Sequence, residues 1–421
     1  MTMPMSFDDE RPDQDSYATK APRDIGPAKP FLILAAAAAV LGAVFAGVST
    51  SDFISHLDRQ VHSIHCSFIP GAGAEIGDSG CRTVMLSPYS SLFRDLLWGG
   101  LPISLLALAV FAYLAMHTAR LLLSSKPFTR HESPYLLAAA ALPAVMSLIY
   151  GYISVSTIGE VCKLCVGIYV SSGGILLGAL MAHALADPAP DEELPMGRYA
   201  RWFGEGVLYV AVLSAAYVLF APTSPKSVQG CGTLARAGDR SIMIPMDVGE
   251  GRTPAIAVLD PLCPACKGFD ERMRASDLYD RLSLNAVLFP LDSSCNWMVK
   301  ESLHPGACAV SEAMLCDKEG ATAILSWAFE NQEGLGAIAR DDGEIRRLIE
   351  KQFPRVKGCL GSAKIKNQLN KSLRWAVANA LPVLTPQLFI GDRRVCDEDT
   401  DLGLEFTVAS MVSRSPARGR P

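Results

Sequence analysis

The segment VCKLCVGIYVSSGGILLGALMAHALA, residues 161–186, is the stretch that decides the fold class. Two cysteines, Cys162 and Cys165, stand at its start, and a largely apolar run follows them. The run is long enough to cross a bilayer, which takes about 20 residues. A dithiol at the mouth of such a span can react with both an aqueous partner and a lipid-soluble one. The segment therefore predicts a membrane protein with thiol chemistry at the membrane surface.

Lys163, between the two cysteines, has two interpretations. A cation beside a thiol favours the thiolate. A lysine next to an apolar run can also extend its side chain to the membrane interface. The sequence leaves both open.

Four more apolar runs lie in the first half of the chain, at residues 31–48, 99–123, 135–155 and 206–220. One such run could be a buried helix of a soluble domain, but five in succession indicate membrane-spanning helices. The first run follows a long acidic leader rather than a short basic region. We therefore expect a retained span there and not a cleaved signal peptide.

Lysine and arginine residues of the loops give these spans an orientation. Loops on one side of the predicted membrane carry Lys20, Arg23, Lys29, Arg120, Lys126, Arg130, Arg198 and Arg201. Because positively charged loops stay in the cytoplasm, we expect the amino terminus there and everything after the fifth span outside. The outer loop also holds a few arginines, with acidic residues interspersed among them.

Composition narrows the class of protein. Only 19% of the 421 residues are charged, against about 25% in an average soluble domain. The formal net charge of −5 gives no broad basic surface, which excludes nucleic acid as the expected partner. Twelve cysteines are too many for a reducing cytosol and indicate an oxidising compartment.

Composition also shifts along the chain, and these shifts give a domain plan. Within the second half, residues 254–260, 282–291 and 387–390 are predicted strands, and about 295–380 is predicted to be mostly helical. The plan has a disordered cytoplasmic amino terminus at 1–30, a transmembrane domain at 31–186, a cytoplasmic loop and fifth span at 187–222, a linker at 223–252, a globular domain at 253–412 and a disordered tail at 413–421.

The sequence Cys263–Pro264–Ala265–Cys266 follows a predicted strand and opens a predicted helix. A thiol at a helix N-terminus faces free backbone N–H groups and the positive end of the helix dipole, both of which favour the thiolate. The thiolate attacks disulfides, and the second cysteine can resolve the mixed disulfide. A zinc ribbon would need a second pair about 15–20 residues away, and none is present, so we favour a redox pair over a metal site or a structural disulfide. Downstream, Thr385–Pro386 before a strand fits a turn with a cis proline.

Cys66 and Cys81 flank a pliable Pro-Gly segment in the outer loop. Such a pair can be a structural disulfide. Because the chain has two other dithiols, we expect this pair to carry electrons between them. His62 and His65 lie close to Cys66 without a further cluster of ligands, so we expect no metal site there.

The six remaining cysteines are expected to form mostly structural disulfides, with buried free thiols as the alternative. Six residues allow 15 pairings, and the sequence does not choose among them, although Cys295 and Cys308 are a plausible short loop. The six are Cys231, Cys295, Cys308, Cys316, Cys359 and Cys396.

Three parts of the membrane half together resemble the vitamin K epoxide reductase family. They are Cys66 with Cys81–Arg82–Thr83–Val84–Met85–Leu86–Ser87, then Gly100–Leu101–Pro102, then Cys162–Lys163–Leu164–Cys165–Val166–Gly167–Ile168–Tyr169. The similarity covers most of residues 31–186, although the interval between Cys66 and Cys81 is longer than is usual in the family. Residues 260–269 and 385–391 resemble a DsbA-type thioredoxin fold. The resemblance implies a membrane α-helical bundle of four helices plus a fifth transmembrane helix, followed by an α/β thioredoxin-fold domain with a helical insertion.

The resemblance also implies roles for individual cysteines. Cys162 and Cys165 match the inner redox pair of the family, with Cys165 as the partner of a quinone. Cys81 matches the loop cysteine that exchanges with Cys162, and Cys66 matches the one that meets the thioredoxin domain.

Ser87 and Tyr169 match a hydroxyl residue and an aromatic residue of the family's quinone site, although they could simply cap a helix and pack between spans. The implied function is that of a quinone-dependent thiol–disulfide oxidoreductase, with ubiquinone or menaquinone as cofactor, that forms disulfides in reduced exported proteins. Electrons would pass from client thiols through Cys263 and Cys266 and then the membrane pairs to the membrane quinone pool. The implied location is the cell inner membrane, with the thioredoxin domain on the periplasmic side.

Two alternatives stay open. The enzyme could run in the opposite direction, as a disulfide reductase or isomerase of the envelope, because direction depends on the relative potentials of the pairs. The chain could also be a non-enzymatic membrane receptor or scaffold whose outer domain is stapled by disulfides.

Overall fold

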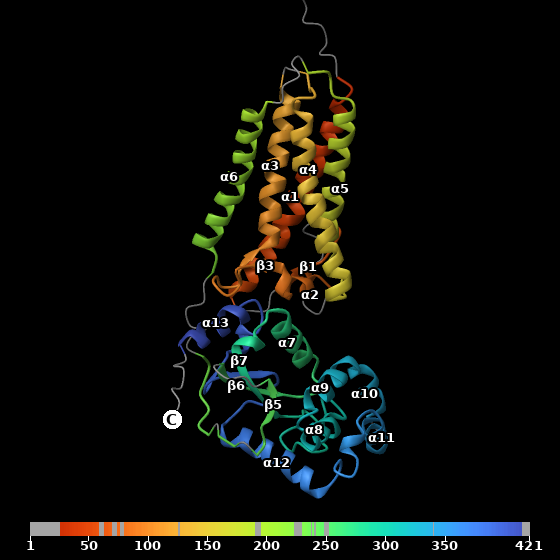
Figure 1. Ribbon diagram of the computed structural model, residues 1–421, viewed down its shortest axis with the longest axis vertical. Coiled ribbons are helices and arrows are strands. Elements are labelled where there is room, and N and C mark those ends of the chain that lie inside the picture. The colour runs from red at the N-terminus through yellow and green to blue at the C-terminus, as the bar shows by residue number, and fades with distance from the viewer. Residues whose placement is uncertain are drawn as a thin grey trace, which may run out of the picture.

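The computed structural model describes a helical bundle and an α/β domain that lies at one end of it (Figure 1). The described residues are 26–58, 63–69, 74–75, 80–124, 127–189, 195–222, 230–236, 238–239, 241–247, 252–339 and 341–414. The long helices of the bundle are α1 (Lys29–Ser55), α3 (Ile103–Leu123), α4 (Ser133–Ile153), α5 (Lys163–Ala184) and α6 (Met196–Phe220).

Among the described residues, five helical segments are long and apolar enough to cross a membrane. They cover 29–58, 103–123, 133–158, 163–184 and 196–220, so each predicted apolar run overlaps one of them. The second begins later than expected because Gly99 and Gly100 adopt positive φ angles of 71° and 76°. These left-handed residues, which glycine tolerates best, turn the chain into the short strand β4 (Leu101–Pro102) before the helix starts.

Small residues let the central helix α1 approach its neighbours closely. α1 packs against both α3 and α5. A Cβ atom at Gly167 of α5 would lie 2.6 Å from the ring of Phe45 in α1. At Gly178, about three turns further along α5, it would lie 2.8 Å from the carbonyl oxygen of Phe31. Glycine at these positions therefore lets α5 pack closely along α1.

The end of the bundle nearest the α/β domain is covered by short elements (Figure 1). They surround the amino-terminal end of α5, because α2 contacts both α5 and β1. These elements are β1 (Ile64–His65), β2 (Ala74–Glu75), α2 (Gly80–Leu86), β3 (Ser91–Leu92) and β4.

The α/β domain contains, within the described part of the chain, a five-stranded sheet in the order β5-β7-β6-β8-β9. β6 runs parallel to β7 and antiparallel to β8, and α7 (Pro264–Ala275) makes the crossover between the parallel pair. This arrangement is the core of a thioredoxin fold. The strands are β5 (Ile244–Asp247), β6 (Thr253–Leu259), β7 (Leu282–Leu288), β8 (Gln387–Ile390) and β9 (Arg393–Arg394).

Helices cover both faces of this sheet. Alternate residues of β6 point to opposite faces: Ala257 and Leu259 join the core beneath α7, whereas Ile256 and Val258 join the core beneath α12. The helices between β7 and β8 form the predicted helical insertion, and the fold class is confirmed. They are α8 (Ala307–Cys316), α9 (Ala321–Glu330), α10 (Gln332–Ile338), α11 (Asp342–Gln352) and α12 (Ala363–Ala378); α13 (Leu404–Arg414) follows the sheet.

The structure differs from the linker expected at 223–252. Within this range, β5 pairs with β7 at the edge of the sheet, and the N–H group of Cys231 donates to the carbonyl oxygen of Arg394 at 2.9 Å. Ile244 of β5 is fully buried, and so is Ile242 in the turn before this strand. Pro245 makes β5 hard to recognise from sequence, because proline cannot donate a hydrogen bond to a neighbouring strand. It is tolerated here because β5 is an edge strand. The amino-terminal residues 1–25 and the tail from 415 lie outside the described residues.

Candidate active sites

The first dithiol lies where α5 begins, at the end of the bundle nearest the α/β domain (Figure 1). Cys162 is the N-cap residue of α5, and Cys165 belongs to its first turn. The backbone N–H of Cys165 donates to the Cys162 sulfur at 3.3 Å. Both thiols are free, with Cys162 buried and Cys165 partly exposed. This geometry allows one thiol of the pair to react while the other stays within reach.

A disulfide packs against this dithiol. Cys66, which follows β1, is bonded to Cys81 in the first turn of α2, with a Cα–Cα distance of 5.7 Å. Both cysteines are buried in one cluster with Phe45 and Cys162, and Cys165 packs against that cluster. The structure therefore brings together four of the predicted site cysteines, in a state with one disulfide and two free thiols.

His65 beside this disulfide is held by a buried carboxylate. Asp52, near the end of α1, accepts the backbone N–H of His65 at 2.9 Å and lies 2.7 Å from its Nδ1 atom. Among the described residues, no group of three or more His, Cys, Asp or Glu side chains could hold a metal ion. His62 lies outside the described residues. We therefore assign His65 to the packing of this loop.

Ser87 and Tyr169 are both close in sequence to residues of the dithiol cluster. Ser87 follows α2, and its hydroxyl donates to the carbonyl oxygen of Val84 at 2.8 Å; Val84 packs against the cluster. Tyr169 lies one helical turn after Cys165, on the same face of α5. A Cβ atom at Gly151 of α4 would lie 3.6 Å from the Tyr169 ring.

The second dithiol belongs to the α/β domain. Cys263 is the N-cap residue of α7, Pro264 occupies the first helical position, and Cys266 lies in the first turn. Both thiols are free, with exposed fractions of 5% and 2%. The Cys263 thiol donates to the carbonyl oxygen of Thr385 at 3.7 Å, and the Thr385–Pro386 peptide bond is cis, as predicted. Thr385 and Pro386 therefore form the wall of this site opposite α7.

The two thiols of this pair are chemically different. A hydrogen bond from the Cys266 thiol lowers the pKa of Cys263 to about 6, and hydrogen bonds at Thr385 and from the Cys266 backbone, with the charge of His304, act in the same direction. Burial raises the pKa of Cys266 well above its ordinary value, as does the neighbouring Cys263. Cys263 is therefore the thiolate at neutral pH, and Cys266 stays protonated.

Asp260 and His304 complete this site, although no sequence motif assigns either of them a role. Asp260 is fully buried and accepts the Nδ1–H of His304 at 2.8 Å and the backbone N–H groups of Leu262 and Leu291 at 2.7 Å each. This hydrogen bond to Asp260 raises the pKa of His304. An acidic residue at the end of an apolar strand, directly before the Cys263 motif, was the available signal for Asp260. Nothing local marks His304, which reads as part of a turn before a helix.

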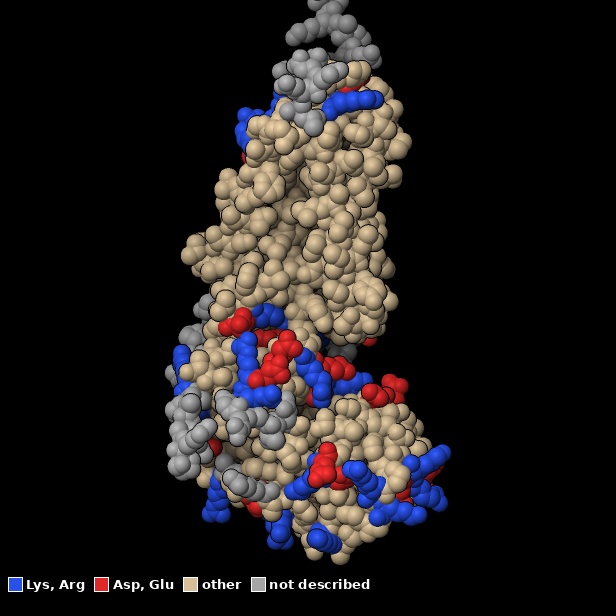
Figure 2. Space-filling view, in the orientation of Figure 1, with Lys and Arg blue, Asp and Glu red and all other residues tan. Residues whose placement is uncertain are grey.

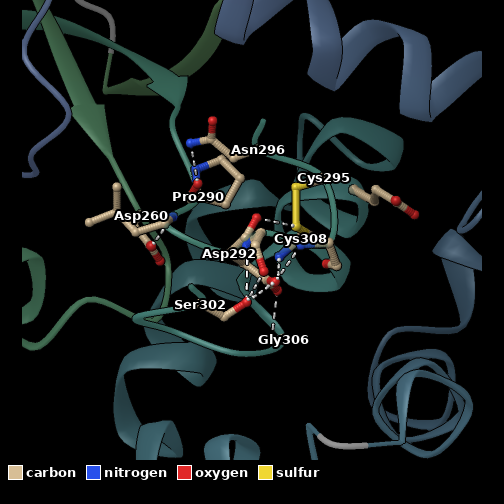
Figure 3. Close-up of a disulfide and its surroundings, with 12 residues drawn as sticks. Asp260, Pro290, Asp292, Cys295, Asn296, Ser302, Gly306 and Cys308 are labelled. Atoms are coloured by element: carbon tan, nitrogen blue, oxygen red, sulfur yellow. Dashed lines mark hydrogen bonds between the residues drawn. A yellow bond between two sulfur atoms is a disulfide. The ribbon is translucent and has the colours of Figure 1, made fainter. Parts of the chain in front are cut away.

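The remaining six cysteines form three disulfides, all within the described residues. Cys295–Cys308 is the short loop suggested by sequence, and Figure 3 shows it beside Asp292 and Asn296. The other two pairings join residues far apart in the chain, which spacing alone does not reveal. They are Cys231–Cys396 and Cys316–Cys359.

Parts of the chain are similar to known proteins. Residues 33–186 match the vitamin K epoxide reductase family. A search of curated proteins gives no significant match. Among solved structures, the oxidoreductase DsbA from Xylella fastidiosa is 20% identical with a TM-score of 0.30, covering 40% of this chain and 89% of its own. ScsC from Proteus mirabilis, in a transitional conformation, is 18% identical with a TM-score of 0.30, covering 52% of this chain and 94% of its own.

The family match and the sheet topology concern different halves of the molecule. The matched residues include the Cys66–Cys81 disulfide and the Cys162 and Cys165 thiols. The strand order and the position of Cys263 before α7 define the other half. Residues 33–186 thus form a domain of the vitamin K epoxide reductase family, and the chain joins it to a thioredoxin-fold domain, a combination that supports a thiol–disulfide oxidoreductase.

Proposed function

We propose that this protein is a quinone-linked thiol–disulfide oxidoreductase that forms disulfides in exported proteins. The observation that carries the proposal is the packing of the Cys66–Cys81 disulfide against the free Cys162 and Cys165 thiols, in a chain with a second free dithiol in a thioredoxin fold. Electrons pass from client thiols to Cys263 and Cys266, then to the loop pair, then to the inner pair.

The first exchange takes place at the thioredoxin fold. A client thiolate attacks the Cys263 sulfur of the oxidised Cys263–Cys266 disulfide, forms a mixed disulfide and releases Cys266, which takes up a proton. The second client thiol then attacks the mixed disulfide and expels Cys263 as a thiolate. The client gains one disulfide, and its two electrons remain on the Cys263 and Cys266 thiols.

The following exchanges repeat this chemistry. The reduced Cys263–Cys266 pair reduces the loop disulfide, with Cys66 as the sulfur attacked. Cys81 then attacks Cys162 of an oxidised inner pair, and the loop disulfide forms again while Cys162 and Cys165 become thiols. The bonding pattern observed, with a disulfide at Cys66–Cys81 and free thiols at the inner pair, is the one expected after this step.

The residues around Cys165 fit a quinone site. Cys165 is partly exposed within an apolar span, and the Tyr169 hydroxyl one turn away makes no hydrogen bond within the described part of the chain. The Tyr169 hydroxyl would donate to a carbonyl oxygen of a ubiquinone or menaquinone. The Ser87 hydroxyl would donate to the ring only after it turns away from the carbonyl oxygen of Val84, to which it donates in this structure. A bound quinone supplies a two-electron acceptor for the Cys162–Cys165 dithiol.

The direction of electron flow is supported by the acidity of Cys263. Its pKa of about 6 means that the reduced pair carries a stabilised thiolate at neutral pH. A stabilised reduced form makes a dithiol pair more oxidising. This favours oxidation of clients over the opposite, reducing direction.

Charges at the two ends of the bundle support the orientation. Figure 2 shows an uncharged belt between basic residues at the far end of the bundle and the charged α/β domain. Because positive loops stay in the cytoplasm, the α/β domain would face the periplasm from an inner membrane. The basic residues of the far end include Lys29, Arg120, Arg130, Arg198 and Arg201.

The test uses the purified full chain in lipid nanodiscs with a defined quinone and a reduced client protein. Cys162→Ser and Cys165→Ser should each abolish quinone reduction, followed by absorbance, and client oxidation, followed by thiol counting. The matched control is the double variant Cys316→Ser/Cys359→Ser, which removes a structural disulfide of the helical insertion and should keep turnover while folded. Quinone turnover retained by either inner-pair variant contradicts the proposed electron path.

A further inference from the structure

The Cys263 motif carries no charged side chain between its cysteines, because Pro264 and Ala265 are both neutral. A cation reaches the motif from elsewhere in the chain. His304, from the loop between β7 and α8, donates its Nδ1–H to Asp260 at 2.8 Å. Its charge lowers the pKa of Cys263, as a smaller contribution than the hydrogen bonds from Cys266 and at Thr385. Only 17% of the His304 side chain is exposed, so the charge acts where water screens it poorly.

Asp260 connects His304 to both cysteines of the motif. Its backbone carbonyl accepts the N–H of Cys263 at 3.2 Å, and its own N–H donates to the Cys266 sulfur at 3.5 Å. Its carboxylate is fully buried and bonded to His304. One residue therefore fixes the active-site turn and the imidazole together.

The loop that carries His304 is held rigidly. The Cys295–Cys308 disulfide closes it, and the carboxylate of Asp292, just before the closed loop, accepts the backbone N–H of Gly306 at 2.9 Å and the hydroxyl of Ser302 at 3.0 Å (Figure 3). His304 lies between Ser302 and Gly306, so its backbone is anchored on both sides. The backbone N–H of His304 also donates to the carbonyl oxygen of Leu291 at 3.2 Å.

We propose that His304 is the cation that stabilises the Cys263 thiolate, and that Asp260 and the loop closed by the Cys295–Cys308 disulfide are positioning elements for it. This role deepens the proposed function, on which it rests. When the second client thiol forms the client disulfide, the bond between the client and Cys263 breaks and its electron pair leaves on the Cys263 sulfur. A protonated His304 lowers the free energy of that leaving thiolate.

The two charges coexist near neutral pH. His304 faces Asp260, Cys263 and Asp292, and all three negative or potentially negative groups raise its pKa, the hydrogen bond to Asp260 most. Cys263 faces Cys266, Thr385 and His304. Above the pKa of Cys263 and below the raised pKa of His304, the site holds a thiolate beside an imidazolium.

The test follows the alkylation of Cys263 by iodoacetamide between pH 4 and pH 9, in the full chain reduced at its dithiols and held in detergent micelles. Peptide mass spectrometry resolves Cys263 from the other thiols and verifies that Cys295 and Cys308 stay paired. The pH at which the alkylation rate is half its maximum is the midpoint of Cys263 ionisation. His304→Gln should raise this midpoint by about one pH unit, which slows alkylation below the midpoint about tenfold. The equilibrium constant for reduction of the pair by glutathione should fall by a similar factor. His304→Lys, which restores a cation, should keep a low midpoint.

Lys300→Gln is the matched control, because it removes an exposed positive charge from the same loop and should leave the midpoint unchanged. If His304→Gln fails to fold, the test depends on the His304→Lys variant. A midpoint of that variant at the ordinary cysteine value overturns the proposal. An unchanged midpoint in His304→Gln also overturns it, as do equal shifts in the Gln and Lys variants, which would mean a structural effect. Neither measurement involves quinone, so loss of quinone turnover in the wild-type chain would count against the proposed function alone.

Discussion

The guanidinium of Arg94 and the carboxylate of Glu405 form a buried ion pair with an Nη1–Oε1 distance of 2.7 Å, although 311 residues separate them in sequence. Arg94 belongs to the segment before α3 in the membrane domain, and Glu405 lies in the first turn of α13. Their side chains are only 6% and 5% exposed. Ser91 accepts the Nε–H of Arg94 at 2.7 Å, and Ser276 donates to Glu405 at 2.9 Å. The two domains are therefore joined by a hydrogen-bonded charge pair shielded from solvent.

An apolar contact lies next to this pair. Trp98 packs edge-on against Phe406 of α13 with ring centroids 5.9 Å apart, and its Nε1–H donates to the carbonyl oxygen of Leu57 at 3.0 Å. Leu402 joins the same buried cluster. Gly403 leaves the space that the Trp98 ring occupies, because a Cβ atom there would lie 2.1 Å from the ring.

Removing one charge of the interdomain pair should open the interface. Arg94→Ala leaves Glu405 buried without its partner, which costs up to about 3–5 kcal/mol. Hydrogen exchange of α13 in the nanodisc-embedded chain should rise, and the combined Arg94→Glu/Glu405→Arg variant should restore part of the protection. Arg281→Ala is the matched control: its pair with Asp95 also joins the two domains, at 3.6 Å, but the side chains are 41% and 44% exposed, and exposed pairs contribute less than about 1 kcal/mol. Equal exchange rates in the Arg94 and Arg281 variants would refute a structural role for the buried pair.

Gly403→Ala should weaken the same interface by a steric route. The added methyl group collides with the Trp98 ring, and the rigid ring is itself held by Leu57, so the two domains must separate slightly. We expect faster cleavage of the junction by a protease in limited digestion. Gly336→Ala in α10, where nothing lies within 4 Å of the new Cβ, should behave like the wild-type chain. An unchanged digestion rate of the Gly403 variant would show that the interface accommodates the methyl group beside Trp98 without loss of stability.

Cys263→Ser should separate the two halves of the electron path. The inner pair is untouched, so quinone reduction by a small dithiol should continue at the wild-type rate. Oxidation of a reduced client protein should stop, because the sulfur that forms the mixed disulfide is gone. Both rates are measured on the same preparation. Loss of both together would mean that the two-module division is wrong.

The acidity of Cys263 makes the stability of the reduced chain depend on pH. Its pKa in the folded protein is lowered to about 6, below the ordinary cysteine value of about 8.5. The stabilisation from the thiolate is therefore fully present above about pH 8.5 and is lost as pH falls through the folded value. The difference in melting temperature between the reduced wild type and Cys263→Ser, measured at several pH values, should grow from pH 5 to pH 9. A constant difference across this range would contradict an acidic Cys263.

Removing structural disulfides should cost stability according to loop size. The Cys295–Cys308 bond closes a loop of sequence separation 13, and its loss should destabilise the α/β domain by about 3 kcal/mol. The Cys316–Cys359 bond closes a separation of 43, and its loss should cost about 1 kcal/mol more in the chain-entropy account. Denaturant unfolding of the paired Cys→Ser variants under non-reducing conditions measures both. The reverse order would show that the disulfides act through local contacts in the folded state instead.

Much of the candidate site was predictable from sequence, because its parts are local patterns. The cysteines of each dithiol stand three positions apart, and each pair opens a helix, so both motifs could be recognised within a few residues. The cis proline turn at Thr385–Pro386 is equally local. His304 escaped recognition because its partner Asp260 is 44 residues away in the chain.

The sequence by itself determined the five membrane spans, the order of the cysteine pairs and the strand–motif–helix unit around Cys263, since length, apolar periodicity and capping residues are properties of neighbouring residues. Only the tertiary structure decided that Cys66–Cys81 packs against Cys162, that β5 completes the sheet, and that Arg94 meets Glu405. These contacts join distant parts of the chain. Which of them form depends on the packing of whole elements against one another, and short-range sequence patterns carry little of that information.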